Sequence, residues 1–418
     1  MSEHHKITGK KILLYFWAFI KWLLIAIVTG VIGGIVGGVF NLSVSYATTM
    51  RESHAWLLWL LPVGGVIIAA LYKVTKMEAK NTNAIIDSVH LGENVPAMLA
   101  PVIFIATVIT HLCGGSAGRE GAALQIGGGL GSNIGRLFGL DEKDIRLATL
   151  CGMSAVFSAL FGTPLTATLF ALEVISVGVF YYSGLVPCLV SSVVAFGVTM
   201  LMGISPTRFI IVMLPLTANL IWRVAILAVI CAAVSSLFCV AMHAAKYYIE
   251  KWLPNTILRA AAGGAVLIAL TLLVGSTDYN GTGMNVIKAA LEHGSAHPMA
   301  FLLKILFTAI TLSCGFRGGE VVPTFFIGAT LGCVVGPLLG IPAGFSAAVG
   351  LIAVFCGAVN CPIASLALSI ELFGSTELMY FALACGISYM LSGYFGLYRS
   401  QKILYSKTRA EFIDINAK

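Results

Sequence analysis

Two stretches of this chain, 201 residues apart, have related sequences, and this internal repeat restricts the fold more than any other feature. Residues 126–140 read IGGGLGSNIGRLFGL and residues 327–341 read IGATLGCVVGPLLGI, which match at seven of fifteen positions. Upstream, the Thr-x-x-Cys-Gly pattern of residues 110–114 recurs at residues 311–315 with the same offset. Because the matches occur in the same order along the chain, they indicate a duplicated unit.

A third match lies downstream of the glycine-rich stretch. In both halves a proline is followed nine residues later by a glutamate, which gives the pairs Pro164 with Glu173 and Pro362 with Glu371. We therefore divide the chain into an N-terminal segment (residues 1–11), two repeats (residues 12–200 and 201–400) and a C-terminal segment (residues 401–418). The two repeated glutamates are interpreted as structural, capping or pairing inside each half.

The composition shows which solvent surrounds these repeats. Hydrophobic residues make up 58% of the chain and charged residues 10%, against about 25% in a typical soluble domain. So few charges cannot cover the surface of a soluble protein, so lipid must be the solvent for most of the chain. We expect an all-α polytopic membrane protein, and a folded soluble enzyme is excluded.

The apolar segments differ in length. Several runs, such as residues 12–39 and 221–242, reach the 20 or so residues that a membrane span needs. Others, such as residues 122–137 and 324–339, are short and broken by glycine or proline, which is typical of discontinuous helices that end inside a transport protein.

The basic residues indicate the orientation. Lysines and arginines concentrate in residues 1–11 and 398–418, and basic flanks of apolar spans stay on the cytoplasmic side. We expect a multi-pass protein of the plasma membrane with both termini in the cytoplasm, which requires an even number of crossings. If each repeat crosses the membrane an odd number of times, the two repeats have inverted orientations. No basic stripe with interleaved aromatics is present, so nucleic-acid binding is not expected.

The glycines of the repeated stretch fall on one helical face. Gly127, Gly131 and Gly135 are four residues apart, and the second half repeats this spacing. Small residues at this spacing let helix backbones approach closely in a membrane. We interpret them as packing positions, since no G-x-G-x-x-G follows a strand.

Charged residues interrupt the apolar sequence at Gly114–Gly121, which reads GGSAGREG. A charge at the bilayer centre costs at least about 2.5–3.5 kcal/mol, so Arg119 and Glu120 are candidates for function. We expect a helix to start near Gly121, where free backbone N–H groups attract an anion. Glu120 is placed to occupy this anion site when the anion is absent. A purely structural Arg–Glu pair remains the alternative.

The second half has an equivalent stretch. Residues 315–323 read GFRGGEVVP, where glycines again lead into a helix and Pro323 suits its first turn. Two helix starts from opposed repeats would converge on one point. An anion there would be bound weakly by several backbone donors, which lets it leave as well as enter.

These motifs resemble those of the CLC family of anion channels and proton-coupled antiporters. GSAGREG followed by a glycine-rich helix, then GGEVVP about 200 residues later, extends the resemblance over nearly the whole membrane domain. It implies the CLC-type inverted repeat with discontinuous, tilted helices. The cytoplasmic CBS domains of many family members are not expected, because the chain ends soon after Tyr405. It also implies that Glu120 is the gating glutamate, and that Tyr405, in a Leu-Tyr-Ser context, points into the central anion site.

Three departures from the family pattern bear on the ion. The stretch Asn81-Thr82-Asn83 replaces the usual serine motif, and the Glu of Gly319-Glu320-Val321-Val322-Pro323 stands within the second motif. Val174 occupies the position of the internal proton-relay glutamate. Together they look like the fluoride-exporting CLC-F branch, which has Met or Asn at the serine position. The resemblance implies Glu320 as a second acid, and the following anion-binding residues: Asn81, Thr82, Asn83, Arg119, Gly121, Val321, Val322 and Tyr405.

These inferences lead to a fluoride/proton antiporter that exports fluoride. A chloride transporter, or a passive channel for chloride or fluoride, stays open because a Thr82 hydroxyl can donate to either ion and the relay glutamate is missing. An intramembrane protease would need a paired Asp set, a Ser/His dyad or H-E-x-x-H, and none is recognisable. The expected partners are fluoride or chloride, protons, the lipid bilayer and a second copy in a homodimer, with no cofactor or metal.

Overall fold

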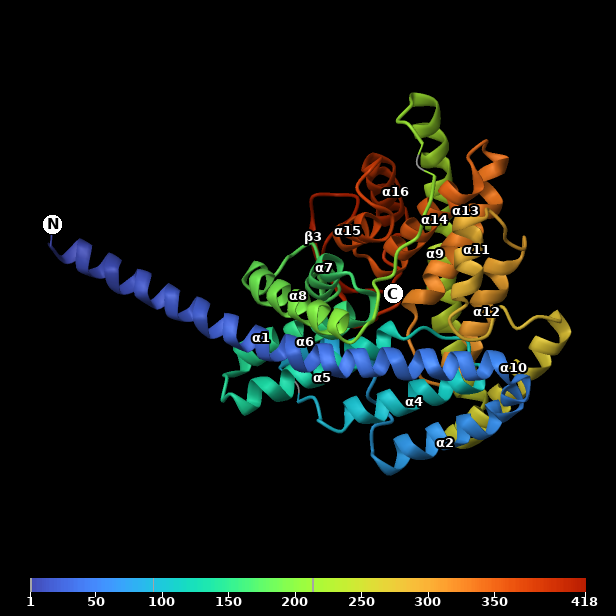
Figure 1. The fold of residues 1–418 in the computed structure, drawn as a ribbon, viewed down its shortest axis with the longest axis horizontal. Coiled ribbons are helices and arrows are strands. Elements are labelled where there is room, and N and C mark those ends of the chain that lie inside the picture. The colour runs from blue at the N-terminus through green and yellow to red at the C-terminus, as the bar shows by residue number, and fades with distance from the viewer. Residues whose placement is uncertain (1, 93, 213) are drawn as a thin grey trace.

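The computed structural model describes residues 2–92, 94–212 and 214–418, with side chains from residue 11 onward. Most of the described chain is helical, as Figure 1 shows, and one small sheet lies near the C-terminus. The elements of the first half are α1 (Ser2–Ser53), η1 (Ala55–Leu60), α2 (Leu61–Val74), α3 (Thr82–Leu91), α4 (Leu99–Cys113), α5 (Glu120–Leu137), α6 (Glu142–Phe161), α7 (Pro164–Glu173), β1 (Ser176–Val177), η2 (Tyr182–Gly184) and α8 (Leu185–Leu201).

The second half begins with the long helix α9. Its elements are α9 (Ala218–Trp252), α10 (Thr256–Val274), α11 (Met284–Glu292), α12 (Ala300–Ser313), α13 (Val321–Leu338), α14 (Ala343–Val359), α15 (Pro362–Phe373), α16 (Leu378–Leu391), β2 (Lys402–Tyr405) and β3 (Phe412–Asn416).

The helices recur in the same order in both halves. Helices α5 and α13 both have 18 residues and begin 201 positions apart, as the duplicated sequence predicts. Each packs along the helix that follows it, α6 or α14, and each is preceded by a shorter apolar helix, α4 or α12. Helices α7 and α15 begin at the repeated prolines.

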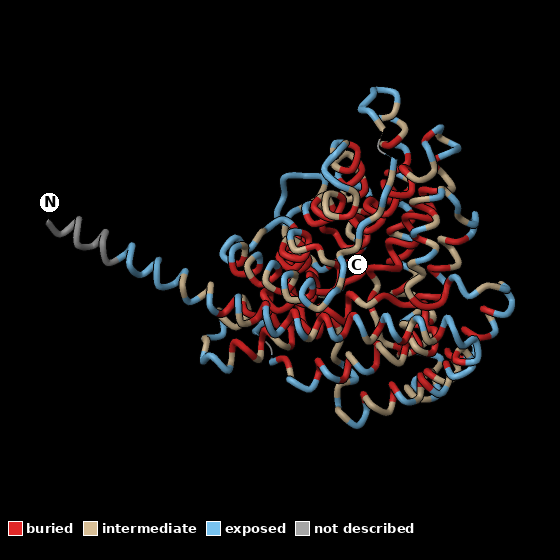
Figure 2. The backbone as a smooth tube through the Cα atoms, viewed as in Figure 1, coloured by how far each residue is buried: buried red, intermediate tan, exposed pale blue. Residues whose placement is uncertain are grey.

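The described chain fits a membrane environment. Seven helices are long and apolar enough to cross a bilayer, and five further apolar helices in the described ranges are shorter. Figure 2 shows the buried residues concentrated in the middle of the molecule. Large hydrophobic side chains such as Leu14, Trp17 and Leu201 are exposed on its outside, where acyl chains would cover them.

Backbone contact between helices explains the glycine spacing. A Cβ atom added to Gly127 of α5 would overlap the carbonyl oxygen of Gly152 in α6. The second half repeats this arrangement, because a Cβ at Gly328 of α13 would overlap the carbonyl of Gly350 in α14. The prediction that these glycines serve packing is confirmed.

The repeated glutamates join the two halves. Glu173, at the end of α7, accepts hydrogen bonds from the backbone N–H groups of Ile363 (3.2 Å) and Ala364 (2.9 Å) at the start of α15. Glu371 of α15 does the same for Leu165 (2.9 Å) and Thr166 (2.8 Å) at the start of α7. The structural interpretation is confirmed, but its expected location inside each half was wrong, because each glutamate caps the helix of the other half.

The C-terminal segment returns to the first half. Strand β2 pairs parallel with β1 and antiparallel with β3, which ties residues 402–416 to the end of α7. Lys407 folds inward, where its Nζ donates to Asn360 Oδ1 (2.5 Å) and Ser392 Oγ (3.2 Å) and lies over the ring of Tyr389. Burial lowers the pKa of Lys407 to about 8.

Candidate functional site

Glu120 occupies the point at which the two halves meet. It is the first residue of α5 and is fully buried. Its Oε2 accepts hydrogen bonds from the backbone N–H of Arg119 (2.9 Å) and from that of Val322 (3.4 Å) in the first turn of α13. The carboxylate therefore lies between the N-termini of two helices that come from different repeats, where each terminus contributes free N–H groups and positive partial charge.

A pair of backbone hydrogen bonds holds the two loops together. The N–H of Gly118 donates to the carbonyl of Gly319, and the N–H of Gly319 donates to the carbonyl of Gly118, both at 2.7 Å. These two residues are 201 positions apart, so equivalent residues of the repeats face each other across a local twofold axis. A Cβ on Gly319 would lie 2.5 Å from the nitrogen of Gly121, which explains why glycine stands there.

Next to this point lies a cavity of about 310 Å³, which we call the Glu320 cavity. Glu320 is the N-cap residue of α13, and the cavity also contains three of the predicted anion-binding residues and several basic side chains. The basic residues that line it are His243, Lys246, Arg259, Arg317 and Arg399, and the acidic ones are Glu78, Glu250 and Glu320. Four lysine and arginine side chains against three glutamates leave an excess of positive charge in this cavity, which attracts anions.

The three residues predicted near the serine position all line the Glu320 cavity, with different contacts. Thr82 is buried, and its hydroxyl donates to the carbonyl of Gly121 at 3.4 Å. Asn81 caps α3 by accepting from the N–H of Ala84, and Asn83 accepts from the N–H of Ser400. Of the three, Thr82 therefore contacts the predicted anion-binding residue Gly121 directly.

The structure does not bring Tyr405 to this site. Tyr405 lies on β2, is 47% exposed, and packs edge-on against Phe412. Tyr398 lines the Glu320 cavity instead, is 1% exposed, and has a hydroxyl without a hydrogen-bond partner among the described residues. The Leu-Tyr-Ser context was a misleading signal, because the backbone passes the site seven residues earlier, before it forms the sheet.

Two polar side chains at the site, Asn41 and Gln125, were not predicted from the sequence, and neither were the contacts of Arg119. Arg119 donates from Nη1 to Asn41 Oδ1 (2.5 Å), and its Nε lies 3.8 Å from Glu120 Oε1. Gln125, one turn after Gly121, donates to Thr82 Oγ1 at 3.1 Å and lines the Glu320 cavity. Both Asn41 and Gln125 are amides inside glycine-rich or apolar helices, a signal that the sequence contained.

Comparison with known proteins identifies the family. A family model described as voltage gated chloride channel matches residues 64–393. The chain belongs to the CLC family. A curated CLC relative, the chloride/fluoride channel protein of Pseudomonas syringae pv. tomato, is 37% identical over 396 residues, which cover 93% of this chain and 87% of the relative. The H(+)/Cl(-) exchange transporter ClcA of Salmonella arizonae is 25% identical, over 85% of this chain and 82% of its own length.

Solved CLC structures agree with this fold. A CLC-type fluoride/proton antiporter superimposes with a TM-score of 0.89 at 31% identity, covering 92% of this chain and 98% of the antiporter. A slow cyanobacterial Cl⁻/H⁺ antiporter superimposes with a TM-score of 0.75 at 21% identity, over 89% and 94% of the two chains, and supports the fold alone. The predicted all-α CLC-type architecture is confirmed, and the protein is a multi-pass membrane transporter for anions.

Proposed function

We propose that this CLC protein exports fluoride in exchange for protons, and that Glu120 is both the gate and the proton carrier. The observation that carries the proposal is the position of the Glu120 carboxylate between the N–H groups of Arg119 and Val322, which belong to opposite repeats. A carboxylate at that place stands in for the anion that the two helix starts would bind.

Protonation weakens the interactions that hold the Glu120 side chain at the two helix N-termini. Its Oε1 is buried without a hydrogen-bond partner in the described chain, and Arg119 Nε is 3.8 Å away. A neutral carboxyl group loses most of its attraction to the helix N-termini, so an incoming anion can take its place. In this mechanism each proton that Glu120 accepts frees the site for one anion, which couples the two fluxes.

The Glu320 cavity and the two helix starts beside it supply the remaining groups of the proposed pathway. Glu320 is the second acid, and the backbone N–H groups of Gly121, Val321 and Val322 are donors to the anion. Tyr398, whose hydroxyl is free among the described residues, takes the role that the sequence assigned to Tyr405. Both Glu120 and Glu320 lie close enough to Tyr398 to interact with it electrostatically.

The fluoride assignment is supported by two relatives. The curated relative at 37% identity is named for chloride and fluoride, and the structural neighbour at 31% identity is a fluoride/proton antiporter. The test is flux from proteoliposomes that contain the purified protein, measured with fluoride, chloride and pH electrodes. We expect fluoride to leave faster than chloride and to drive protons inward against their gradient. Chloride flux equal to or greater than fluoride flux would overturn the fluoride assignment.

The role of Glu120 is tested in the same liposomes. Glu120→Gln removes the charge and keeps the shape, so fluoride-driven proton movement should be lost. The control is Glu292→Gln at the end of α11, which removes a carboxylate that pairs with Lys288 outside both the Glu120 site and the Glu320 cavity. Equal proton coupling in the Glu120→Gln protein and the control would refute the gate.

A passive channel of the same fold is the second candidate. It is favoured by Val174, a buried apolar residue at the position where chloride/proton antiporters carry their internal relay glutamate, and by the word channel in the name of the Pseudomonas relative. A channel would dissipate the fluoride gradient without moving protons uphill. The pH-electrode measurement on the wild-type protein therefore distinguishes a channel from an antiporter.

A further inference from the structure

Arg51 is a charged residue that the transport site does not use. It lies in the last turn of α1, and only 9% of its side chain is exposed. Its Nη2 is 3.5 Å from Glu52 Oε1, and its Nε has no hydrogen-bond partner in the described part of the chain. A guanidinium carries five N–H donors, so one long ion pair leaves Arg51 with donors to spare.

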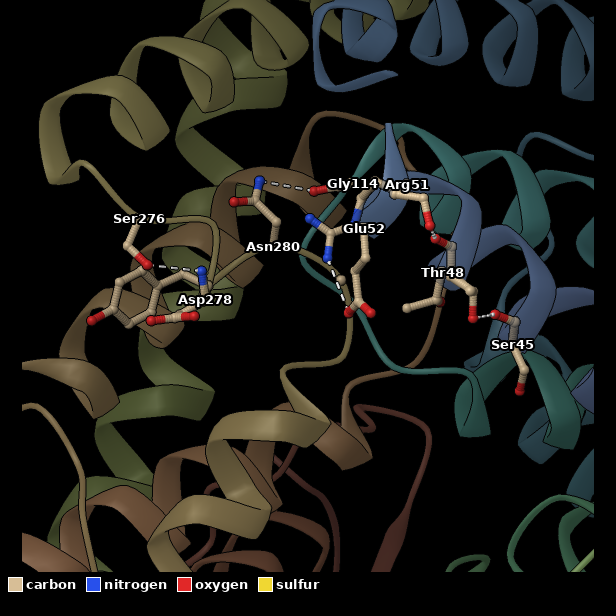
Figure 3. A network of polar contacts seen from close by, with 12 residues as sticks. Ser45, Thr48, Arg51, Glu52, Gly114, Ser276, Asp278 and Asn280 are labelled. Atoms are coloured by element: carbon tan, nitrogen blue, oxygen red, sulfur yellow. Dashed lines mark hydrogen bonds and ion pairs between the residues drawn. The ribbon is translucent and has the colours of Figure 1, made fainter. Parts of the chain in front are cut away.

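Packing fixes this guanidinium in place. The Cδ of Arg51 lies against Gly114, where an added Cβ would come within 3.0 Å of it, and Gly114 has φ of +90°, which favours glycine. The carbonyl of Gly114 accepts from Asn280 Nδ2 at 3.0 Å. Figure 3 shows Arg51 and Asn280 on either side of this loop, with Glu52 below the guanidinium.

Arg51 faces a second cavity of about 580 Å³, which we call the Arg51 cavity. It is separate from the Glu320 cavity and reaches Arg119, whose Nε lies 3.8 Å from Glu120. Arg51 and Arg119 thus line the same cavity, and Arg119 directly precedes Glu120 in the chain. The other charged or polar side chains at its wall include Ser45, Thr48, Glu52, Asp278 and Asn280.

A third cation lies behind the wall of the Arg51 cavity. Lys304 of α12 is fully buried, and its Nζ donates to the carbonyls of Tyr279 (3.1 Å) and Gly281 (2.7 Å), with no carboxylate partner in the described residues. These carbonyls belong to the loop between α10 and α11, which also contributes Asp278 and Asn280 to the cavity. The carboxylates of Glu52 and Asp278 balance the two arginines that line the cavity, so Lys304 is the basic group left over near Arg51. Its unbalanced charge favours a negative ligand there.

We propose that the Arg51 cavity holds a small inorganic anion at the outer mouth of the pathway, with Arg51 as its main ligand and Glu52 as its competitor. The hydroxyl of Thr48 donates to Val44 within α1, and that of Ser45 donates to Asn41, so the guanidinium is the group with unused donors. The Glu52 carboxylate is 46% exposed, so it can swing into water when the anion arrives.

The length of α1 places this cavity opposite the N-terminus. Its apolar part runs over 43 residues from Lys11 to Ser53, which at 1.5 Å per residue is about 65 Å, more than the roughly 30 Å hydrocarbon core. If the N-terminus is cytoplasmic, as the basic flank predicts, the end of α1 and Arg51 lie at the outer face.

The first test is crystallographic and does not depend on transport. Crystals of the full chain grown in bromide should show an anomalous peak beside the Arg51 guanidinium, and Arg51→Gln should abolish this peak. No bromide in the wild-type cavity would overturn the proposal. Bromide beside Arg51 in a chain that moves no fluoride would overturn the proposed function and leave this inference standing.

The second test measures transport from a defined side and rests on the proposed function. In right-side-out vesicles, Arg51→Gln should raise the half-saturating external fluoride concentration about fivefold to tenfold, which corresponds to about 1 kcal/mol. Glu52→Gln should lower it about twofold to threefold, because the competing carboxylate is gone. In inside-out vesicles neither change should alter half-saturation.

Matched controls separate this role from a structural one. Arg223→Gln removes one cation with a similarly unpartnered Nε, whose Nη1 donates to the carbonyl of Gly340 outside both cavities, and should leave half-saturation unchanged. Arg51→Lys keeps the charge and should retain most of the outer affinity. The proposal would be overturned if Arg51→Gln changed the half-saturating fluoride concentration equally in right-side-out and inside-out vesicles. It would also be overturned if Glu52→Gln failed to lower this concentration at the outer face, which is a check that remains if the Arg51 variant folds poorly.

Discussion

The reciprocal glutamate caps predict an asymmetric loss of stability. Glu173→Ala removes two charge-assisted hydrogen bonds, to the N–H groups of Ile363 and Ala364, and leaves both donors without a partner. Glu371→Ala removes the equivalent pair at Leu165 and Thr166. Glu173 is 7% exposed, whereas Glu371 is half-buried, so water can replace the second carboxylate more easily than the first.

The expected decreases in the free energy of unfolding follow from these hydrogen bonds. A hydrogen bond to a charged group contributes about 1.5–3 kcal/mol to stability, and the cost of burying the carboxylate offsets part of this contribution. We expect Glu173→Ala to lower the free energy of unfolding by about 3–4 kcal/mol and Glu371→Ala by about 1–2 kcal/mol. Glu173→Gln, which keeps one acceptor oxygen, should fall between the wild type and the alanine variant.

The assay is reversible unfolding of the purified protein in mixed micelles, with sodium dodecyl sulfate as the denaturant and tryptophan fluorescence as the signal. Fluoride flux per folded molecule should stay near the wild-type value, because neither glutamate lines the Glu320 cavity. A loss below about 1 kcal/mol for Glu173→Ala, or a larger loss for Glu371→Ala, would refute the assignment of buried cross-repeat caps.

Three further predictions use matched pairs or a pH series. Gly127→Ala should cost about 1–3 kcal/mol of stability because its methyl group overlaps α6, whereas Gly129→Ala, whose Cβ would have 3.8 Å of clearance, should be neutral or slightly stabilising in the same unfolding assay. Tyr398→Phe should slow fluoride flux about tenfold, by the loss of one hydroxyl donor, and Tyr405→Phe should leave the flux unchanged. Because burial lowers the pKa of Lys407 from 10.5 to about 8, the unfolded chain binds more protons between these values, so stability should rise with pH across this window in the wild type and not in Lys407→Met.

Much of the fold could be predicted because the relevant signals are local or repeated. The offset of 201 residues predicted that α13 would start 201 residues after α5, and the glycine spacing predicted which helix faces touch a neighbour. The repeated prolines at residues 164 and 362 begin α7 and α15, in keeping with the preference of proline for the first turn of a helix.

The site was predicted in part. The Arg-Glu sequence in a glycine-rich, apolar context marked Glu120 as a candidate, since an idle charge in a membrane is costly. The partner of its carboxylate, the N–H of Val322, is 202 residues away, and only the fold brings them together. The tyrosine was predicted wrongly because a three-residue motif cannot distinguish two tyrosines seven residues apart on a chain that turns from the site into a strand.

By itself, the sequence determined that lipid surrounds the chain, that the fold is helical and duplicated, and which charged residues stand in apolar sequence. These properties depend on composition and on the spacing of residues along the chain. Only the tertiary structure decided which half caps which helix, which tyrosine lines the Glu320 cavity and that Arg51 shares a cavity with Arg119. These are contacts between residues far apart in the chain, and their geometry depends on how inverted helices pack around a common axis.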